Sequence, residues 1–168
     1  ADPHPVDPRP GRLVDVGAAD LAFHDAALDL ESLREAQVRG CASVIHLVQA
    51  LGSKDGLARP RVLIVTEQAQ PVGDGPLRIA QSPVLGVGKG IWMENPELWG
   101  GMVDVSAGPV EEKVAAVMAE LGEPDGETHV AYRAGRRLVQ RLVRRSRPEP
   151  GRPEVHADAT YVVTGGTG

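Results

Sequence analysis

The residues best suited to chemistry lie at the end of the chain, where Tyr161-Val162-Val163-Thr164 runs into Gly165-Gly166-Thr167-Gly168. A short β-branched run followed by closely spaced glycines is typical of the strand and tight turn that open a dinucleotide site. In such a site, the N-terminal N–H groups of the next helix hold the pyrophosphate. We therefore predict a strand over residues 161–164 and cofactor contacts from Thr164, Gly165, Gly166, Thr167 and Gly168. An ordinary glycine turn is the alternative.

Other reactive side chains do not combine into a catalytic or metal site. A phenol that protonates a carbonyl needs a lowered pKa, which a Lys four residues later supplies in one large class of reductases. Here Arg136 follows Tyr132 at that spacing, and Gly165 follows Tyr161. Cys41 and His46 are five residues apart on an expected helix, a spacing that does not converge two metal ligands. We expect no catalytic and no metal-binding residue in this chain.

A second glycine-rich segment, Gly86-Val-Gly-Lys-Gly90, does not read as a phosphate loop. It follows no predicted strand, and no Ser or Thr follows its Lys to hold Mg²⁺. We interpret these glycines as residues that let a helix pack closely.

Composition limits the class of protein. The chain has 168 residues, a formal net charge of −5 and a hydrophobic fraction of 42%. This balance suits a globular core and gives no basic footprint for nucleic acid. The single Cys41 excludes an internal disulfide and indicates a reducing compartment, so we expect a cytoplasmic protein. No apolar run is long enough to span a bilayer, and no secretory signal is recognisable.

The order of the predicted elements gives the fold class. Strands are expected over residues 12–16, 61–66, 101–105, 128–132 and 138–143, and helices over 28–51, over 79–93 and from Pro109. Strands that alternate with helices predict an α/β fold, a mainly parallel sheet with helices on both faces. This is a truncated Rossmann-like arrangement, and the continuous β-branched run 61–66 is typical of a strand buried on both faces.

Helical periodicity predicts which side chains enter the core. Val44, Leu47, Val48 and Leu51 share one face of the first long helix, and Val110, Val114, Val117, Met118 and Leu121 form an apolar stripe on the last. We expect both faces to pack on the sheet. Trp92 and Trp99 are expected to be core anchors rather than a ligand cage.

Proline-rich segments divide the chain. Residues 1–11 are expected to be a linker or loop, residues 12–147 a globular unit, residues 148–158 a second linker, and residues 159–168 the start of another unit. Both ends are expected to be cuts within a longer protein.

Four segments together resemble the ketoreductase region of modular, type I, polyketide synthases. They are Gln81-Ser-Pro-Val-Leu-Gly-Val-Gly-Lys-Gly90, Glu94-Asn-Pro-Glu-Leu-Trp-Gly-Gly-Met-Val-Asp104, Val130-Ala-Tyr-Arg-Ala-Gly-Arg-Arg-Leu-Val-Gln-Arg-Leu142 and Thr160-Tyr-Val-Val-Thr-Gly-Gly-Thr-Gly168. The chain departs from the family at Lys89, where an Arg is usual, and at Ala159, where a Gly is usual.

The resemblance implies a short-chain dehydrogenase/reductase-type fold built as two Rossmann-like halves. Residues 12–147 would be the structural, non-catalytic half, and residues 159–168 the start of the half that binds NADPH. The implied role is to scaffold the reduction of a β-ketoacyl group carried by an acyl carrier protein, inside a multifunctional synthase. Its partners would be the catalytic half and the other domains of that synthase. The alternative is a docking module from a reductively inactive ketoreductase-like domain.

Overall fold

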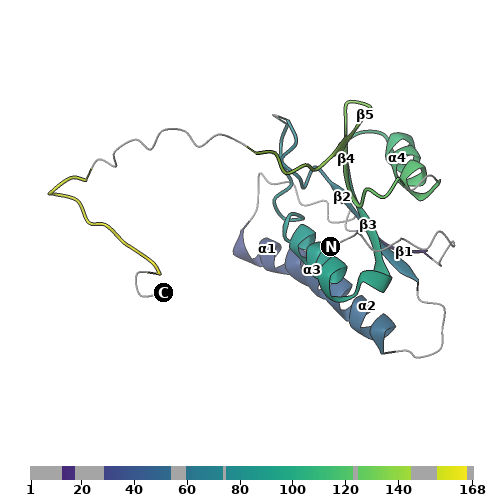
Figure 1. Ribbon diagram of the computed structural model, residues 1–168, viewed down its shortest axis with the longest axis horizontal. Helices are drawn as coiled ribbons and strands as arrows, with labels where there is room; N and C mark the ends of the chain where they lie inside the picture. The colour runs from purple at the N-terminus through teal and green to yellow at the C-terminus, as the bar shows by residue number, and fades with distance from the viewer. Residues whose placement is uncertain are drawn as a thin grey trace.

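The computed structural model describes residues 13–17, 29–53, 60–73, 75–122, 125–144 and 155–165. Its strands are β1 (Leu13–Gly17), β2 (Arg61–Glu67), β3 (Trp99–Val105), β4 (His129–Arg133) and β5 (Arg136–Val139), in one sheet of order β1-β2-β3-β4-β5. Neighbours from β1 to β4 are parallel, and β5 returns antiparallel beside β4 (Figure 1). The predicted mainly parallel sheet is confirmed, although β5 is shorter than the expected strand over 138–143.

The helices begin and end where local chemistry allows. Helix α1 (Leu30–Gln37) starts after Asp29, whose Oδ1 accepts a hydrogen bond of 2.7 Å from the backbone N–H of Ser32. A π-helical turn, η3 (Val38–Ala42), joins it to α2 (Ser43–Gly52). Pro83 lies in the first turn of α3 (Pro83–Glu94), and a short 3₁₀ turn, η4 (Pro96–Leu98), leads into β3. Helix α4 (Val110–Gly122) precedes β4.

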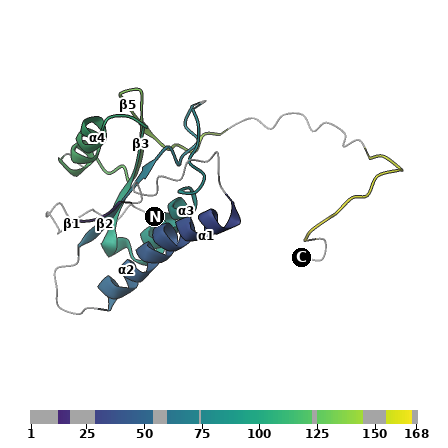
Figure 2. The same ribbon diagram turned by 180° about the vertical axis from the view of Figure 1, so that it is seen from behind.

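One face of the sheet is covered by α1, α2 and α3 (Figures 1 and 2). The core on this side contains Val44 and Val48 of α2, with partly buried Leu47 and Leu51 packed against it, as predicted. They meet alternate residues of the strands, among them Val62, Ile64 and Met102. Apolar surface buried in this way contributes roughly 25 cal/mol per Å² to folding.

Helix α4 covers the opposite face, so helices on both faces are confirmed. Leu63, Val65, Val103 and Val105 point to this side and pack with Ala116. All three crossovers step in the same direction across the sheet, from β1 to β4. Since α4 lies on the other face, the connection from β3 to β4 has the opposite hand to the first two. Crossover connections between parallel strands are right-handed in about 98% of cases, so a sheet that contains crossovers of both hands is rare.

The predicted orientation of α4 is wrong for most of its apolar stripe. Val117 is partly buried, but Val110, Val114, Met118 and Leu121 are exposed. The inward side instead carries Lys113, Ala116, Val117 and Glu120, which are spaced i, i+3, i+4 and i+7. Ion pairs from Lys113 to Glu67 and from Glu120 to Arg137 hold that side of the helix toward the sheet.

The tryptophan prediction is half correct. Trp99 is buried at the start of β3, but the Trp92 side chain is 52% exposed. The reason is its angular position, because Val84, Gly88 and Ile91 form the buried side of α3.

Gly88 and Gly90 make a matched pair for testing the packing of α3. A Cβ on Gly88 would lie 2.6 Å from Met102 Sδ, whereas a Cβ on Gly90 would meet nothing within 4 Å. We expect Gly88→Ala to lower the free energy of unfolding by about 1–3 kcal/mol through overpacking. Gly90→Ala should raise it by about 0.5–1 kcal/mol, since Ala favours the helix. Urea unfolding of both variants measures this, and equal effects would contradict it.

Candidate functional site

The glycine motif at the end of the chain does not follow a strand. Residues 161–163 have no assigned secondary structure, and the Val162 side chain is 87% exposed, so the predicted strand over 161–164 is wrong for this chain. A strand needs a neighbour for its N–H and C=O groups, and no strand in the described residues pairs with this segment. In Figures 1 and 2 the segment lies apart from the sheet.

The chain bends at Thr164 and Gly165, the first two residues of the motif. Gly165 has a φ of 77°, which glycine adopts readily, and Thr164 and Gly165 are both exposed. Gly166, Thr167 and Gly168 lie outside the described residues. Cofactor contacts from these five residues stay a prediction.

A different set of polar side chains gathers at the carboxyl ends of β2, β3 and β4, the edge where open α/β sheets bind their ligands. The set comprises Thr66 and Glu67 of β2, Asp104 of β3 and Arg133 of β4. Thr66, Glu67 and Asp104 are buried within the described fold.

Asp104 is fully buried at 0% exposure, and its carboxylate has several hydrogen-bond donors. Oδ1 accepts hydrogen bonds from Thr66 Oγ1 at 2.5 Å and from the Ala69 N–H at 2.9 Å. Oδ2 accepts one from the Gln70 N–H at 3.2 Å and is paired with the Arg133 guanidinium. Arg133 also donates to the carbonyl of Gln70 at 3.1 Å and to that of Asp104 at 3.1 Å. A buried carboxylate is tolerated only with this degree of pairing.

Glu67 forms a second buried centre beside it. Its carboxylate pairs with Arg78 and with Lys113 of α4, and its own N–H donates to Gln81 Oε1 at 2.9 Å. The chain then turns at Gln68, a non-glycine residue with a positive φ of 51°. The Gln68 N–H donates to the carbonyl of Val105 at 3.0 Å, which holds this turn to the end of β3.

These residues do not fit a dinucleotide at this edge. A pyrophosphate is held by free backbone N–H groups at a glycine turn. Here no glycine lies among residues 68–72, directly after β2, and the N–H groups of Ala69 and Gln70 already donate to Asp104. The carboxylate of Asp104 thus lies where an anionic ligand would need donors.

The sequence analysis missed the pairing of Asp104 with Arg133. A signal was available, because Asp104 interrupts an apolar strand between Val103 and Val105. A charged residue in such a position must be paired when the strand is buried.

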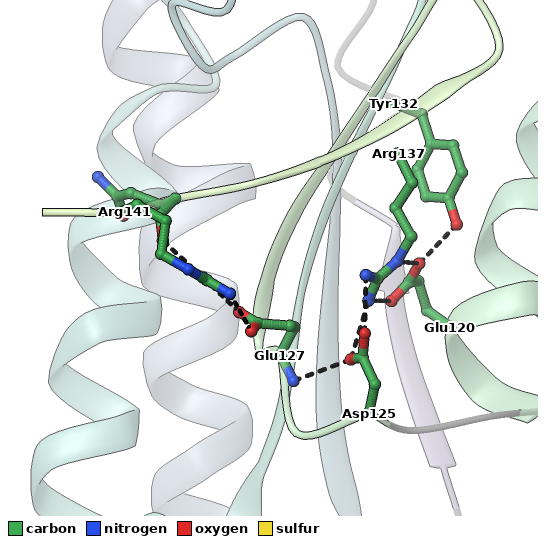
Figure 3. A network of polar contacts seen from close by, with 7 residues as sticks. Glu120, Asp125, Glu127, Tyr132, Arg137 and Arg141 are labelled. Carbon is green, nitrogen blue, oxygen red and sulfur yellow. Dashed lines mark hydrogen bonds and ion pairs between the residues drawn. The ribbon is translucent and has the colours of Figure 1, made fainter. Parts of the chain in front are cut away.

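A third polar cluster joins α4 to the β4–β5 hairpin (Figure 3). Glu120 accepts hydrogen bonds from Arg137 Nε at 2.7 Å and from the Tyr132 hydroxyl at 2.5 Å. Arg137 also donates to Asp125 at 2.8 Å and 3.0 Å. The hydrogen bonds from Arg137, above all, hold the pKa of the Glu120 carboxyl below its ordinary value.

Tyr132 is unsuited to proton transfer. Burial, and then its hydrogen bond with Glu120, raises the pKa of the Tyr132 phenol to about 12. General acid catalysis needs a pKa near the working pH. Burial likewise raises the pKa of the Cys41 thiol, whose Sγ donates to Gln37 Oε1 at 3.3 Å. Among the described residues no group of His, Cys, Asp and Glu could hold a metal ion.

The pairing of Glu120 with Arg137 predicts that the free energy of unfolding depends on pH. A carboxyl whose pKa is lowered by folding stabilises the protein above its unfolded pKa, about 4.3 for Glu. That contribution is lost as the pH falls through the folded pKa. Glu120→Gln should therefore cost about 0.5–1 kcal/mol at pH 7 and flatten the loss of stability between about pH 5 and pH 3.

The test is urea unfolding across that pH range. Glu111→Gln, on the exposed side of the same helix, is the matched control and should keep the slope of the parent chain. An unchanged slope in Glu120→Gln would contradict the role of this pair.

Comparison with known proteins places this geometry in a family. The profile described as "Polyketide synthase extender module SpnB, Rossmann fold domain" matches residues 5–142. Within the described residues, no helix combines the length and apolar character needed to cross a membrane.

Similar proteins are parts of multidomain synthases. One polypeptide of the phenolphthiocerol/phthiocerol polyketide synthase of Mycobacterium tuberculosis is 35% identical over 164 residues, covering 96% of this chain and 10% of that protein. Erythronolide synthase EryA3 of Saccharopolyspora erythraea is 39% identical over 129 residues, covering 74% of this chain and 4% of that protein. The chain thus spans only a small part of these relatives.

A solved structure shows the same fold. The C2-type ketoreductase from a modular polyketide synthase aligns with a TM-score of 0.61 and 32% identity, over 77% of this chain and 27% of that one. This chain therefore belongs to the family of Rossmann-fold domains of polyketide synthase extender modules, and it corresponds to the structural region of their ketoreductases.

Proposed function

We propose that this chain is the non-catalytic structural half of a polyketide synthase ketoreductase. The observation that carries the proposal is the closed carboxyl edge, where Asp104 and Arg133 take up the donors and the space that a cofactor would need. In this role the domain positions a neighbouring catalytic half, which would use NADPH to reduce a β-ketoacyl group on an acyl carrier protein.

The boundaries follow from the same proposal. Residues 12–147 form the structural half, residues 148–158 a linker, and residues 159–168 the opening of the catalytic half. Thr164, Gly165, Gly166, Thr167 and Gly168 would then contribute to NADPH binding only together with the rest of that half. The synthase would work in the cytoplasm, consistent with a single free Cys41.

The outer face of α1 to α3 supplies a surface for packing against a neighbour. Leu30, Val38 and Ile45 are exposed there, and Gly86 and Gly90 leave a part of α3 without side chains. Glycine inside a helix costs about 0.5–1 kcal/mol relative to alanine. Nothing in the described fold approaches either glycine closely enough to require it. Close approach of a neighbouring domain would supply a reason for both.

The cofactor assignment predicts that the 168-residue chain alone does not bind NADPH usefully. We expect a Kd weaker than about 1 mM, equivalent to less than about 4 kcal/mol of binding. We also expect no NADPH-dependent reduction of a β-ketoacyl thioester by this chain. A longer ketoreductase region, which contains this chain and the catalytic half, should bind NADPH and reduce the thioester. Calorimetry and absorbance of NADPH measure this. Micromolar binding by the short chain, or an inactive longer region, would reject the proposal.

Val162 tests whether the exposed 161–163 segment becomes a strand when the catalytic half is present. In the 168-residue chain, Val162→Asp should leave the melting temperature unchanged, because the side chain is 87% exposed. In the longer ketoreductase region, the same change should bury an unpaired carboxylate and lower the free energy of unfolding by at least about 2 kcal/mol. Val155→Asp, also exposed in the same segment, is the control. Equal melting temperatures in the longer region would refute the packing role.

A further inference from the structure

A pocket lies at the amino end of β4, beside the end of α3 and away from the carboxyl edge that Asp104 and Arg133 close. Its volume is about 380 Å³, and it is lined by Lys89, Trp92, Met93, Thr128, His129 and Gln140. The lining comes from the end of α3, the start of β4 and the residue after β5. The carboxylates of the buried clusters described above do not line it.

The rim of this pocket is unusually apolar for a surface. Trp92 is 52% exposed, and its neighbour Met93 is 75% exposed. The Trp92 ring lies edge-on to the His129 ring at a centroid distance of 6.5 Å, and the buried Trp99 ring lies 5.5 Å from His129 on the inside. Adjacent exposed Trp and Met side chains are typical of the anchor residues of protein interfaces.

The wall of the pocket is mainly apolar and carries a few polar groups, among them Lys89 and His129. The exposed Lys89 has no ion pair among the described residues, and His129 Nε2 is buried there without a hydrogen-bond partner. His129 Nδ1 lies 3.1 Å from Thr128 Oγ1. Burial, and then the Lys89 cation, lowers the pKa of the His129 imidazole, which favours its neutral form. A buried polar atom without a hydrogen-bond partner destabilises the fold, and a suitable partner would relieve that cost.

We propose that this pocket docks an acidic–apolar segment of another domain of the same synthase. An apolar side chain of that segment would pack on Trp92 and Met93, and a neighbouring Asp or Glu carboxylate would pair with Lys89. The inference rests on the proposed function only in placing the segment in the same synthase.

A polypeptide explains the exposure better than a small ligand does. A small molecule inside the pocket would leave the outer surfaces of Trp92 and Met93 in water, whereas a chain laid across the rim covers them. The pocket lies at the end of α3, the helix that also carries the exposed Gly86 and the half-buried Gly90, so one neighbouring domain can contact both. Lys89 gives the charge complementarity, since an acidic residue is the partner it lacks.

The three methionines of the chain provide an internally controlled test. Met93 is 75% exposed at the pocket, Met118 is 59% exposed on α4, and Met102 is 2% exposed in the core. Peroxide oxidises methionine according to its accessibility. In the 168-residue chain, Met93 and Met118 should oxidise at similar rates and Met102 slowest. In the intact synthase, we expect Met93 oxidation to slow by about tenfold or more, as measured by peptide mass spectrometry.

Variants of the intact synthase identify the contacts. Lys89→Glu and Trp92→Ala should each restore Met93 oxidation toward the rate of the short chain. Arg136→Glu, an exposed charge reversal on the β4–β5 hairpin, is the control and should not. Reductase activity of each variant is recorded as a separate readout.

Three results would overturn the pocket assignment. The first is that Met93 oxidises as fast in the intact synthase as in the short chain. The second is that neither Lys89→Glu nor Trp92→Ala changes the slow oxidation of Met93 in the synthase. The third is that Met93 oxidation in the short chain slows as the chain concentration rises, which would identify a second copy as the partner. An active reductase with unprotected Met93 would reject the pocket while the proposed function stands. Slow Met93 oxidation in a synthase without reductase activity would reject the proposed function and leave the pocket assignment standing.

Discussion

The buried carboxylate of Asp104 is the constraint on which the carboxyl edge depends. It receives donors from β2 through Thr66, from the turn after β2 through Ala69 and Gln70, and from β4 through Arg133. One side chain of β3 therefore fixes the relative ends of three parallel strands. Removing either charge would leave the other buried without a partner, which is far more costly than exchanging both. The same interaction that orders the edge also closes it to an anionic ligand.

The ion pairs also explain the position of α4. A helix placed only by its hydrophobic stripe would turn Val114 and Met118 inward. Instead Lys113 and Glu120 bind partners on or beside the sheet, and the small Ala116 lets the helix approach between them. The helix thus forms ion pairs with its inward side and leaves most of its apolar stripe exposed to solvent. Periodicity predicts which residues share one side of a helix. Which side of α4 faces the sheet is determined here by its ion-pair partners in the rest of the fold.

The fold was predictable because its signals are local and strong. The β-branched run ending in Thr66 defines β2, and the spacing of Val44, Val48 and Leu51 defines the inner face of α2. The site was less predictable. The Asp104–Arg133 pair joins residues 29 apart in sequence, and no local pattern specifies such a pair. The strand over residues 161–164 failed for a related reason, since its ladder partner is not among the described strands.

The fold combines an apolar core with two buried carboxylates and several large apolar side chains exposed on its surface. Charges occupy buried positions, as Glu67 and Asp104 do, while Trp92, Met93 and Val162 face solvent. A monomer that functions alone gains nothing from large exposed apolar side chains, whereas a domain inside a larger synthase can bury them against its neighbours. The closed edge and the open faces therefore have one explanation. The carboxylate of Asp104 at the carboxyl edge is satisfied without a ligand, and on our proposal the exposed apolar side chains are buried against other domains of the synthase.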